Sequence, residues 1–213
     1  MLRSVVFDFG GVLAEEGFRE GLREIARKNG LDPDDFSFTA DLLIYTTGYL
    51  TGHATEEDFW KAVRERTGVR GTDKDLRGEI LKRFLLRPPV VSCVDLLRAK
   101  GFFLAMLSDQ TNWLEELDPS GSLSGRFDRV LNSMRTGRSK RTASTFGYLC
   151  ETLELEPREM LFIDDNKGHI ERATNMGLNT ILYTTYEDFR KKVQLMTGVL
   201  CGPGDPAAPP GTG

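Results

Sequence analysis

The chain has 213 residues and a formal net charge of −4, from 28 basic and 32 acidic side chains. This mildly acidic balance disfavours a nucleic-acid-binding domain, which is usually basic with clustered Lys and Arg. The sequence contains no run of about 18 apolar residues, so it predicts neither a membrane span nor a membrane partner.

The first predicted element is a buried strand, indicated by the short apolar run from Ser4 to Phe7. Asp8 follows it directly, and the next turn contains Gly10 and Gly11. In an open parallel sheet, ligands bind outside the carboxyl ends of the strands. Glycine also lets the backbone approach a ligand closely. Asp8 is therefore a candidate site residue.

Residues 14–87 show four helical patterns and no strand pattern. Three of these helices begin after residues that are suited to cap a helix, namely Asp32, Thr55 and Thr72. The last of the four is predicted to run to about Leu86. An all-helical block of this size is expected to form a domain of its own.

From Pro88-Pro89 onward the pattern alternates between helices and strands. Strands are expected at 102–107, 129–131, 160–163 and 180–183, and helices at 90–100, 111–117, 142–153, 167–176 and 186–196. Such alternation is typical of a parallel sheet covered on both faces. The predicted fold class is α/β. A Rossmann-like doubly wound parallel core (1–13 and 88–200) carries an inserted α-helical cap (14–87), and a flexible Pro/Gly-rich tail (201–213) follows.

The three cysteines, Cys93, Cys150 and Cys201, fit no metal-ligand or redox spacing. They are interpreted as reduced thiols. The first residues form a strand pattern and show no signal-peptide pattern. We therefore expect a cytoplasmic protein.

Polar side chains follow several of the predicted strands, and they would meet at one edge of the sheet. Three carboxylates crowded together raise one another's pKa values unless a cation is present. Oxygen ligands of this kind suit Mg²⁺, which is commonly held by carboxylates together with a substrate phosphate. A carboxylate can also attack phosphorus and form an aspartyl-phosphate. The converging residues are Asp8, Ser108, Lys140, Asp164 and Asp165.

These residues resemble motifs one to four of the haloacid dehalogenase superfamily, in order and at fitting spacing. The motifs are Phe7–Leu13, Leu107-Ser108, Lys140 and Phe162–Asn166. The resemblance implies that Asp8 is the nucleophile, that Ser108 holds a phosphate oxygen, and that Lys140 orients and partly neutralises Asp8 and the phosphate. It also places Gly11 and Asp109 at the substrate-binding site. The Mg²⁺ ligands that it implies are Asp8, the Gly10 carbonyl, Asp164 and Asp165.

Gly10 departs from the phosphatase pattern, which has a second Asp at this position to protonate the leaving group and activate water. General acid–base catalysis contributes about 10²- to 10⁴-fold. The substrate could have a better leaving group, such as a sugar 1-phosphate or an acyl phosphate. Another residue, such as His53, could replace the missing acid. The third alternative is that the protein binds phosphorylated ligands without hydrolysing them.

The predicted function is a Mg²⁺-dependent phosphatase that hydrolyses a small phosphorylated metabolite through an aspartyl-phosphate. The first alternative is a non-catalytic protein that binds phosphorylated ligands and acts in regulation. The second is a 2-haloacid dehalogenase, since those enzymes also lack the second Asp. However, they work without metal and lack the paired acids of motif four. No oligomeric state is predicted.

Overall fold

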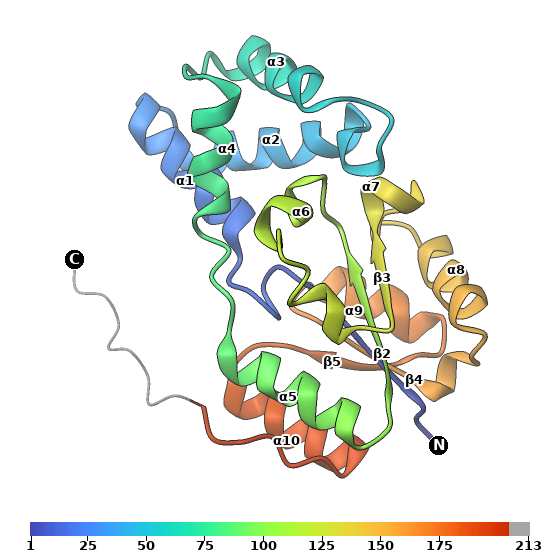
Figure 1. The fold of residues 1–213 in the computed structure, drawn as a ribbon. Helices are drawn as coiled ribbons and strands as arrows, with labels where there is room; N and C mark the ends of the chain where they lie inside the picture. The colour runs from blue at the N-terminus through green and yellow to red at the C-terminus, as the bar shows by residue number, and fades with distance from the viewer. Residues whose placement is uncertain (205–213) are drawn as a thin grey trace.

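Five parallel strands form the centre of the computed structural model, which describes residues 1–204 (Figure 1). Each predicted strand is found, with its ends shifted by at most one residue. The strands lie in the order β3-β2-β1-β4-β5, so Asp8 leaves the sheet from its central strand. Their bounds are β1 (Ser4–Phe7), β2 (Phe103–Ser108), β3 (Arg129–Asn132), β4 (Met160–Asp164) and β5 (Asn179–Leu182).

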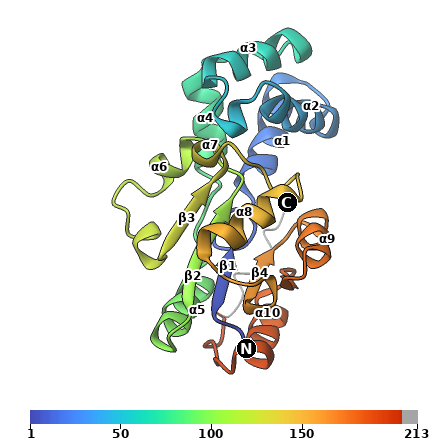
Figure 2. The ribbon, with the colours of Figure 1, turned by 90° about the vertical axis from the view of Figure 1, so that its right-hand side faces the viewer.

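Helices cover both faces of this sheet, because successive side chains of a strand point to opposite faces. Val5 and Phe7 of β1 belong to the core that includes α5 (Pro88–Ala99) and α10 (Tyr186–Thr197). Val6 belongs to a second core, on the face covered by α8 (Ser144–Leu153) and α9 (Lys167–Asn175), as Figure 2 shows. This arrangement confirms the predicted doubly wound α/β fold.

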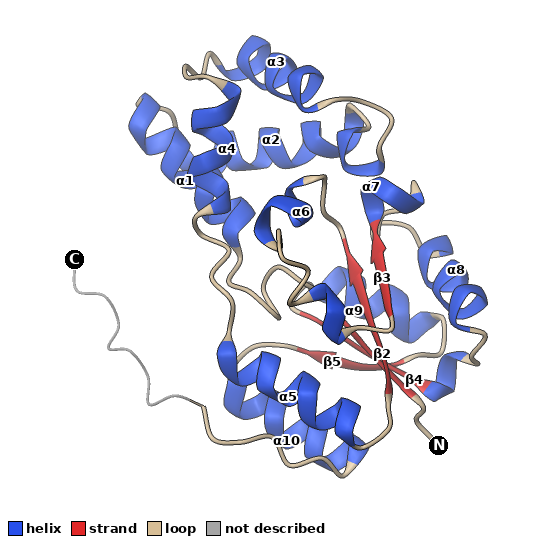
Figure 3. Ribbon diagram, viewed as in Figure 1, coloured by secondary structure: helices blue, strands red, loops and turns tan. Residues whose placement is uncertain are grey.

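The four α-helices that lie between β1 and α5 in the chain sit beyond the carboxyl end of the sheet (Figure 3). They are α1 (Gly17–Asn29), α2 (Pro33–Thr46), α3 (Glu56–Thr67) and α4 (Asp73–Leu81). Asp32 caps α2 and Thr55 forms a capping box on α3, in agreement with the capping pattern. No helix among residues 1–204 has the length and apolar character needed to cross a bilayer.

The last of these helices is shorter than predicted and ends at Leu81 rather than near Leu86. The residues after it pair with the segment that leaves β1, because Glu15 N donates to Leu85 O at 2.8 Å and Arg87 N donates to Leu13 O at 2.8 Å. The two connections between the helical block and the sheet therefore run side by side. The division into core (1–13, 88–200) and cap (14–87) remains a prediction.

Polar contacts fix the helical block to the sheet edge. The Tyr49 hydroxyl donates to Asn112 Oδ1 at 2.7 Å, in the loop before α6 (Trp113–Leu117). The hydroxyl of Ser133, the first residue of α7 (Ser133–Thr136), donates to Leu50 O at 2.8 Å. The helical block therefore covers the edge of the sheet at which the strands end.

A disulfide joins Cys93 of α5 to Cys201, which lies 108 residues later. The prediction of reduced thiols is therefore wrong for these two residues, while Cys150 is free. Cysteine spacing identifies motifs that are local in sequence, and this pair meets only because α5 and the end of the chain pack together.

The chain after α10 contacts the core at two points. Cys201 is buried, and the Tyr186 hydroxyl donates to Gly202 O at 2.8 Å. The flexible tail (201–213) remains a prediction, and its residues 205–213 lie outside the described residues.

Candidate active site

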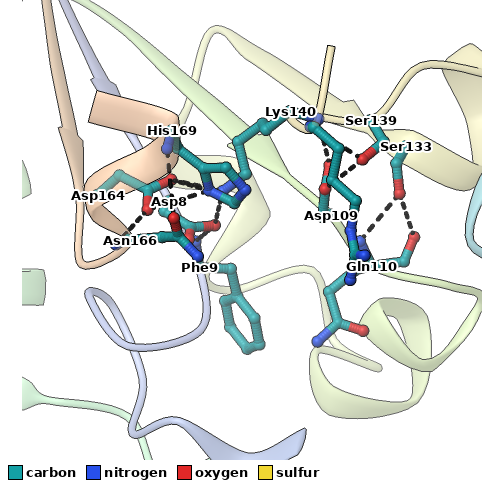
Figure 4. Close-up of polar contacts among 11 residues, drawn as sticks. Asp8, Phe9, Asp109, Gln110, Ser133, Ser139, Lys140, Asp164, Asn166 and His169 are labelled. Carbon is teal, nitrogen blue, oxygen red and sulfur yellow. Dashed lines mark hydrogen bonds and ion pairs between the residues drawn. The ribbon is translucent and has the colours of Figure 1, made fainter. Parts of the chain in front are cut away.

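A buried lysine joins the ends of two neighbouring strands (Figure 4). Asp8 follows β1, Asp164 ends β4, and the Asp8 backbone N–H donates to Ile163 O at 2.9 Å. Lys140 Nζ lies 2.7 Å from Asp8 Oδ1 and 2.7 Å from Asp164 Oδ2. The exposed fractions of Lys140, Asp8 and Asp164 are 1%, 7% and 0%. Buried charges need partners of opposite sign, so these three groups depend on one another.

Burial and the neighbouring charges shift the pKa values of this group. Burial raises the pKa of Asp8 well above its usual value, although Lys140 opposes the shift. Burial acts on Asp164 in the same direction, but the charge of Lys140 and the hydrogen bond with His169 outweigh it and lower its pKa. Burial and the charge of Asp164 raise the pKa of Asp165. Three carboxylates thus face one ammonium group, which leaves an excess of negative charge.

The donor atoms fit a divalent cation. Asp8, Asp164 and Asp165 each offer a carboxylate oxygen, and the three oxygens all lie within 4.8 Å of one another. Gly11 makes room for Asp165: its φ is +83°, and a Cβ there would lie less than 3.0 Å from the Asp165 carboxylate. Hard oxygen ligands with excess negative charge are what Mg²⁺ prefers.

Asp109 and Ser108 both lie at the end of β2 but have different surroundings. Asp109 accepts hydrogen bonds from Ser139 Oγ at 2.6 Å and from the Lys140 backbone N–H at 2.9 Å. Both of its oxygens therefore hold the loop that carries Lys140. Ser108 is 2% exposed and pairs in register with Asn132 of β3. The substrate-binding roles of Asp109 and Ser108 remain predictions.

His169 is a site residue that the four sequence motifs do not include. Its Nδ1 lies 3.1 Å from Asp164 Oδ2 and 3.2 Å from Oδ1. Asn166 brings the ring there, since its side chain caps α9 by accepting from the Gly168 and His169 backbone N–H groups. The sequence does contain a signal that could identify His169, namely a capping Asn directly after the paired acids with a His three residues later.

A cavity of about 720 Å³ lies above this centre, between the sheet edge and the helical block. Gly11, Ser108 and Asp164 do not line it. The predicted site residues that do line it are Asp8, Gly10, Asp109, Lys140 and Asp165. His53 does not line it, and its ring instead contacts Thr51 Oγ1 at 3.1 Å. Besides Lys140, four further cations line the same cavity: Arg19, Arg141, Lys167 and Arg172.

Comparisons with known proteins agree with this fold. The chain is 28% identical to the bifunctional epoxide hydrolase 2 of Sus scrofa over 93% of its own length and 39% of that protein. It thus spans less than half the length of the epoxide hydrolases that it matches. Other relatives are named as a phosphoglycolate phosphatase and as (S)-2-haloacid dehalogenases.

Solved structures match nearly the whole chain. A predicted HAD-like family hydrolase of Porphyromonas gingivalis has a TM-score of 0.76 and 26% identity, over 92% of this chain and 97% of that one. A HAD family enzyme of Bacteroides thetaiotaomicron, in complex with magnesium and inorganic phosphate, has a TM-score of 0.71 and 20% identity, over 90% of this chain and 99% of that one.

The family comparison covers most of the sheet and all four motifs. The model of the haloacid dehalogenase-like hydrolases matches residues 2–177, which contain Asp8, Ser108, Lys140 and the paired acids. The resemblance drawn from the motifs is therefore confirmed, and the chain belongs to the haloacid dehalogenase-like hydrolase family.

Proposed function

We propose that this hydrolase is a Mg²⁺-dependent phosphatase that acts on a small phosphorylated metabolite. The observation that carries the proposal is the group of three carboxylates around Lys140, directly below the cavity. Asp8, the Gly10 carbonyl, Asp164 and Asp165 would hold the metal ion. When bound, the ion supplies positive charge that offsets the charge of the carboxylates and of the phosphate.

In the proposed reaction, an oxygen of Asp8 attacks the phosphorus atom and the bond from phosphorus to the leaving oxygen breaks. The ammonium group of Lys140 orients the Asp8 carboxylate and neutralises charge beside it. The Ser108 hydroxyl would hold a phosphoryl oxygen. Water then attacks phosphorus, which releases inorganic phosphate and restores Asp8. Positioned positive charge is the main requirement of this chemistry.

The cavity supports a small anionic substrate. Its volume of about 720 Å³ lies within the usual range of small-molecule sites. Arg19, Lys167 and Arg172 add positive charge around it, whereas Arg141 is paired with Asp41 at 2.7 Å. Phosphorylated metabolites such as sugar 1-phosphates have the charge and size that this lining favours.

The three carboxylates also bear on the dehalogenase alternative. Displacement of a halide by Asp8 needs one nucleophilic carboxylate and no metal. In that reaction Asp164 would still pair with Lys140, but Asp165 would have no metal ion to hold. The phosphatase proposal gives all three a role. The Bacteroides thetaiotaomicron enzyme, which has the same fold, is known with magnesium and inorganic phosphate, and this too supports the phosphatase.

The test is phosphate release from sugar 1-phosphates, sugar 6-phosphates, acyl phosphates and nucleotides, with and without Mg²⁺. We expect metal-dependent turnover that Asp8→Asn abolishes. If no substrate is hydrolysed while Mg²⁺ still binds, the phosphatase proposal fails and the binding-protein alternative is favoured. Metal-independent halide release from 2-haloacids would favour the dehalogenase.

A further inference from the structure

The position of the missing acid, Gly10, faces an aromatic ring. A Cβ on Gly10 would lie 3.1 Å from Phe84 Cε1. Phe84 is 7% exposed and stacks on Phe9, with ring centroids 5.5 Å apart and an interplanar angle of 27°. The space beside the nucleophile on this side is therefore apolar and filled. It holds no proton donor.

The same phenylalanine lies against the residue that follows Glu16. A Cβ on Gly17 would come within 2.8 Å of the Phe84 backbone nitrogen, so the chain passes tightly over this ring. Glu16 is half-buried and lines the cavity together with Asp8 and Gly10. It is thus a carboxyl group at the same cavity as the nucleophile, supplied by the segment that enters the helical block.

The contacts of Glu16 leave one of its oxygens available. Its Oε2 accepts a hydrogen bond from the Arg19 backbone N–H at 2.9 Å and so caps α1. This bond orients the carboxyl group and uses one oxygen, which leaves Oε1 for a ligand. The charged groups that act on its carboxyl group are Arg19 and Glu20 of α1 and Asp165 after β4. Other charged groups that line the same cavity include Asp41 of α2, Lys140, Arg141, Lys167 and Arg172.

The acidity of Glu16 also suits proton transfer. Burial raises the pKa of Glu16 to about 7; Arg19 opposes the shift, and the negative charges of Asp165 and Glu20 add to it. A general acid or base is most effective when its pKa lies near the working pH. Near neutrality, Glu16 would exist in both protonation states.

We propose that Glu16 is the general acid and base of this phosphatase and replaces the group that is missing at Gly10. The inference rests on the proposed function. As Asp8 attacks phosphorus and the phosphorus–oxygen bond breaks, the leaving oxygen takes the proton of the Glu16 carboxyl group and departs as an alcohol. Glu16, now a carboxylate, then takes a proton from water as the water oxygen attacks phosphorus and the Asp8–phosphorus bond breaks.

The test compares an alkyl phosphate with p-nitrophenyl phosphate, whose leaving group departs without a proton. In Glu16→Gln the amide oxygen can still accept from Arg19 N, so the helix cap is kept. We expect kcat/KM for the alkyl phosphate to fall about 100-fold or more and kcat/KM for p-nitrophenyl phosphate to fall much less. A burst of p-nitrophenol is also expected, because slower attack by water lets the aspartyl-phosphate accumulate.

The matched control is Glu57→Gln, which removes the same charge from the first turn of α3 at an exposed position outside the cavity. It should leave the ratio of the two kcat/KM values unchanged and give no burst. Equal loss on both substrates in Glu16→Gln, or no loss, without a burst would overturn the role of Glu16 while leaving the phosphatase intact. If the wild-type protein hydrolyses neither substrate, the proposed function fails, and this inference fails with it.

Discussion

The Asp109 carboxylate accepts hydrogen bonds from the backbone N–H of Lys140, at 2.9 Å, and from Ser139 Oγ, at 2.6 Å. Asp109 therefore fixes the loop that carries the buried lysine. Asp109→Ala should lower the free energy of unfolding by about 1–3 kcal/mol, since two donors lose their partner. It should also lower kcat/KM, because Lys140 is no longer held against Asp8. Denaturant unfolding and phosphate release measure the two effects.

Asp109→Asn is the matched control, because its amide oxygen can still accept one of the two hydrogen bonds. We expect the free energy of unfolding and the kcat/KM of Asp109→Asn to lie between those of the wild-type protein and those of Asp109→Ala. If Asp109 instead contacts the substrate directly, both variants should raise KM and leave stability unchanged. That result would contradict the positioning role.

The ends of the strands could be predicted from the sequence, whereas the direction of the side chains could not. Apolar runs followed by polar residues locate Asp8 and Asp164, and parallel topology then requires them to meet at one edge. The turn of Asp109 towards the Lys140 loop depends on contacts between segments 30 residues apart. No local pattern specifies such a contact.

The same limit explains why the sequence could not assign the groups around the nucleophile. Phe84 reaches Gly10 only because the connections into and out of the helical block run side by side. Likewise, His169 reaches Asp164 only through the particular geometry of the capped turn before α9. The residue types are visible in the sequence, but their proximity is a product of the tertiary fold.

His169 contacts Asp164 through Nδ1, and we predict that His169→Ala weakens Mg²⁺ binding. Groups that hydrogen-bond to a metal ligand orient it, and their loss commonly lowers metal affinity about 10- to 100-fold. Isothermal titration calorimetry with MgCl₂ measures the change. His53→Ala is the control, because His53 contacts Thr51 rather than the acidic cluster. Equal affinities for the two variants would contradict the prediction.

Gly11 leaves room for the Asp165 carboxylate, so Gly11→Ala should impair both stability and Mg²⁺ affinity. The control is Gly68→Ala, which has a similar φ of +72° but no atom within 4 Å of its Cβ. Gly68→Ala should lower the free energy of unfolding only by the cost of a left-handed backbone, about 1–2 kcal/mol. We expect a larger loss of unfolding free energy at Gly11 and a loss of Mg²⁺ binding at Gly11 alone. Calorimetric titration and denaturant unfolding of both variants would decide this.

Asp8 is a carboxylate that folding removes from water, and Asp8→Asn should therefore stabilise the metal-free protein at pH 7. Burial raises the pKa of Asp8 in the folded state. The pKa of an Asp side chain in the unfolded state is about 3.9. Because the pKa in the folded state is higher, the folded protein loses stability as the pH rises from the first pKa towards the second. Asn carries no charge and escapes this loss.

The check is thermal unfolding in EDTA as a function of pH. At pH 7 the variant should melt higher, by about 2–4 °C for each kcal/mol gained. The difference should disappear below the unfolded pKa, where Asp8 is protonated in both states. Added Mg²⁺ should stabilise the wild-type protein more than Asp8→Asn, since binding to the folded state alone raises its stability. A lower melting temperature for the variant at pH 7 would contradict the prediction.

The Cys93–Cys201 disulfide closes a loop across a sequence separation of 108 residues and ties α5 to the segment after α10. Cross-linking a loop of this length restricts the unfolded chain and is expected to contribute about 2–5 kcal/mol. Cys93→Ser should lower the free energy of unfolding by that amount, and reduction of the wild-type protein should have the same effect. Cys150→Ser, which changes the free cysteine, should have a much smaller effect. Thiol titration of the unfolded, unreduced protein checks the bond itself: one reactive thiol agrees with the disulfide, and three would rule it out.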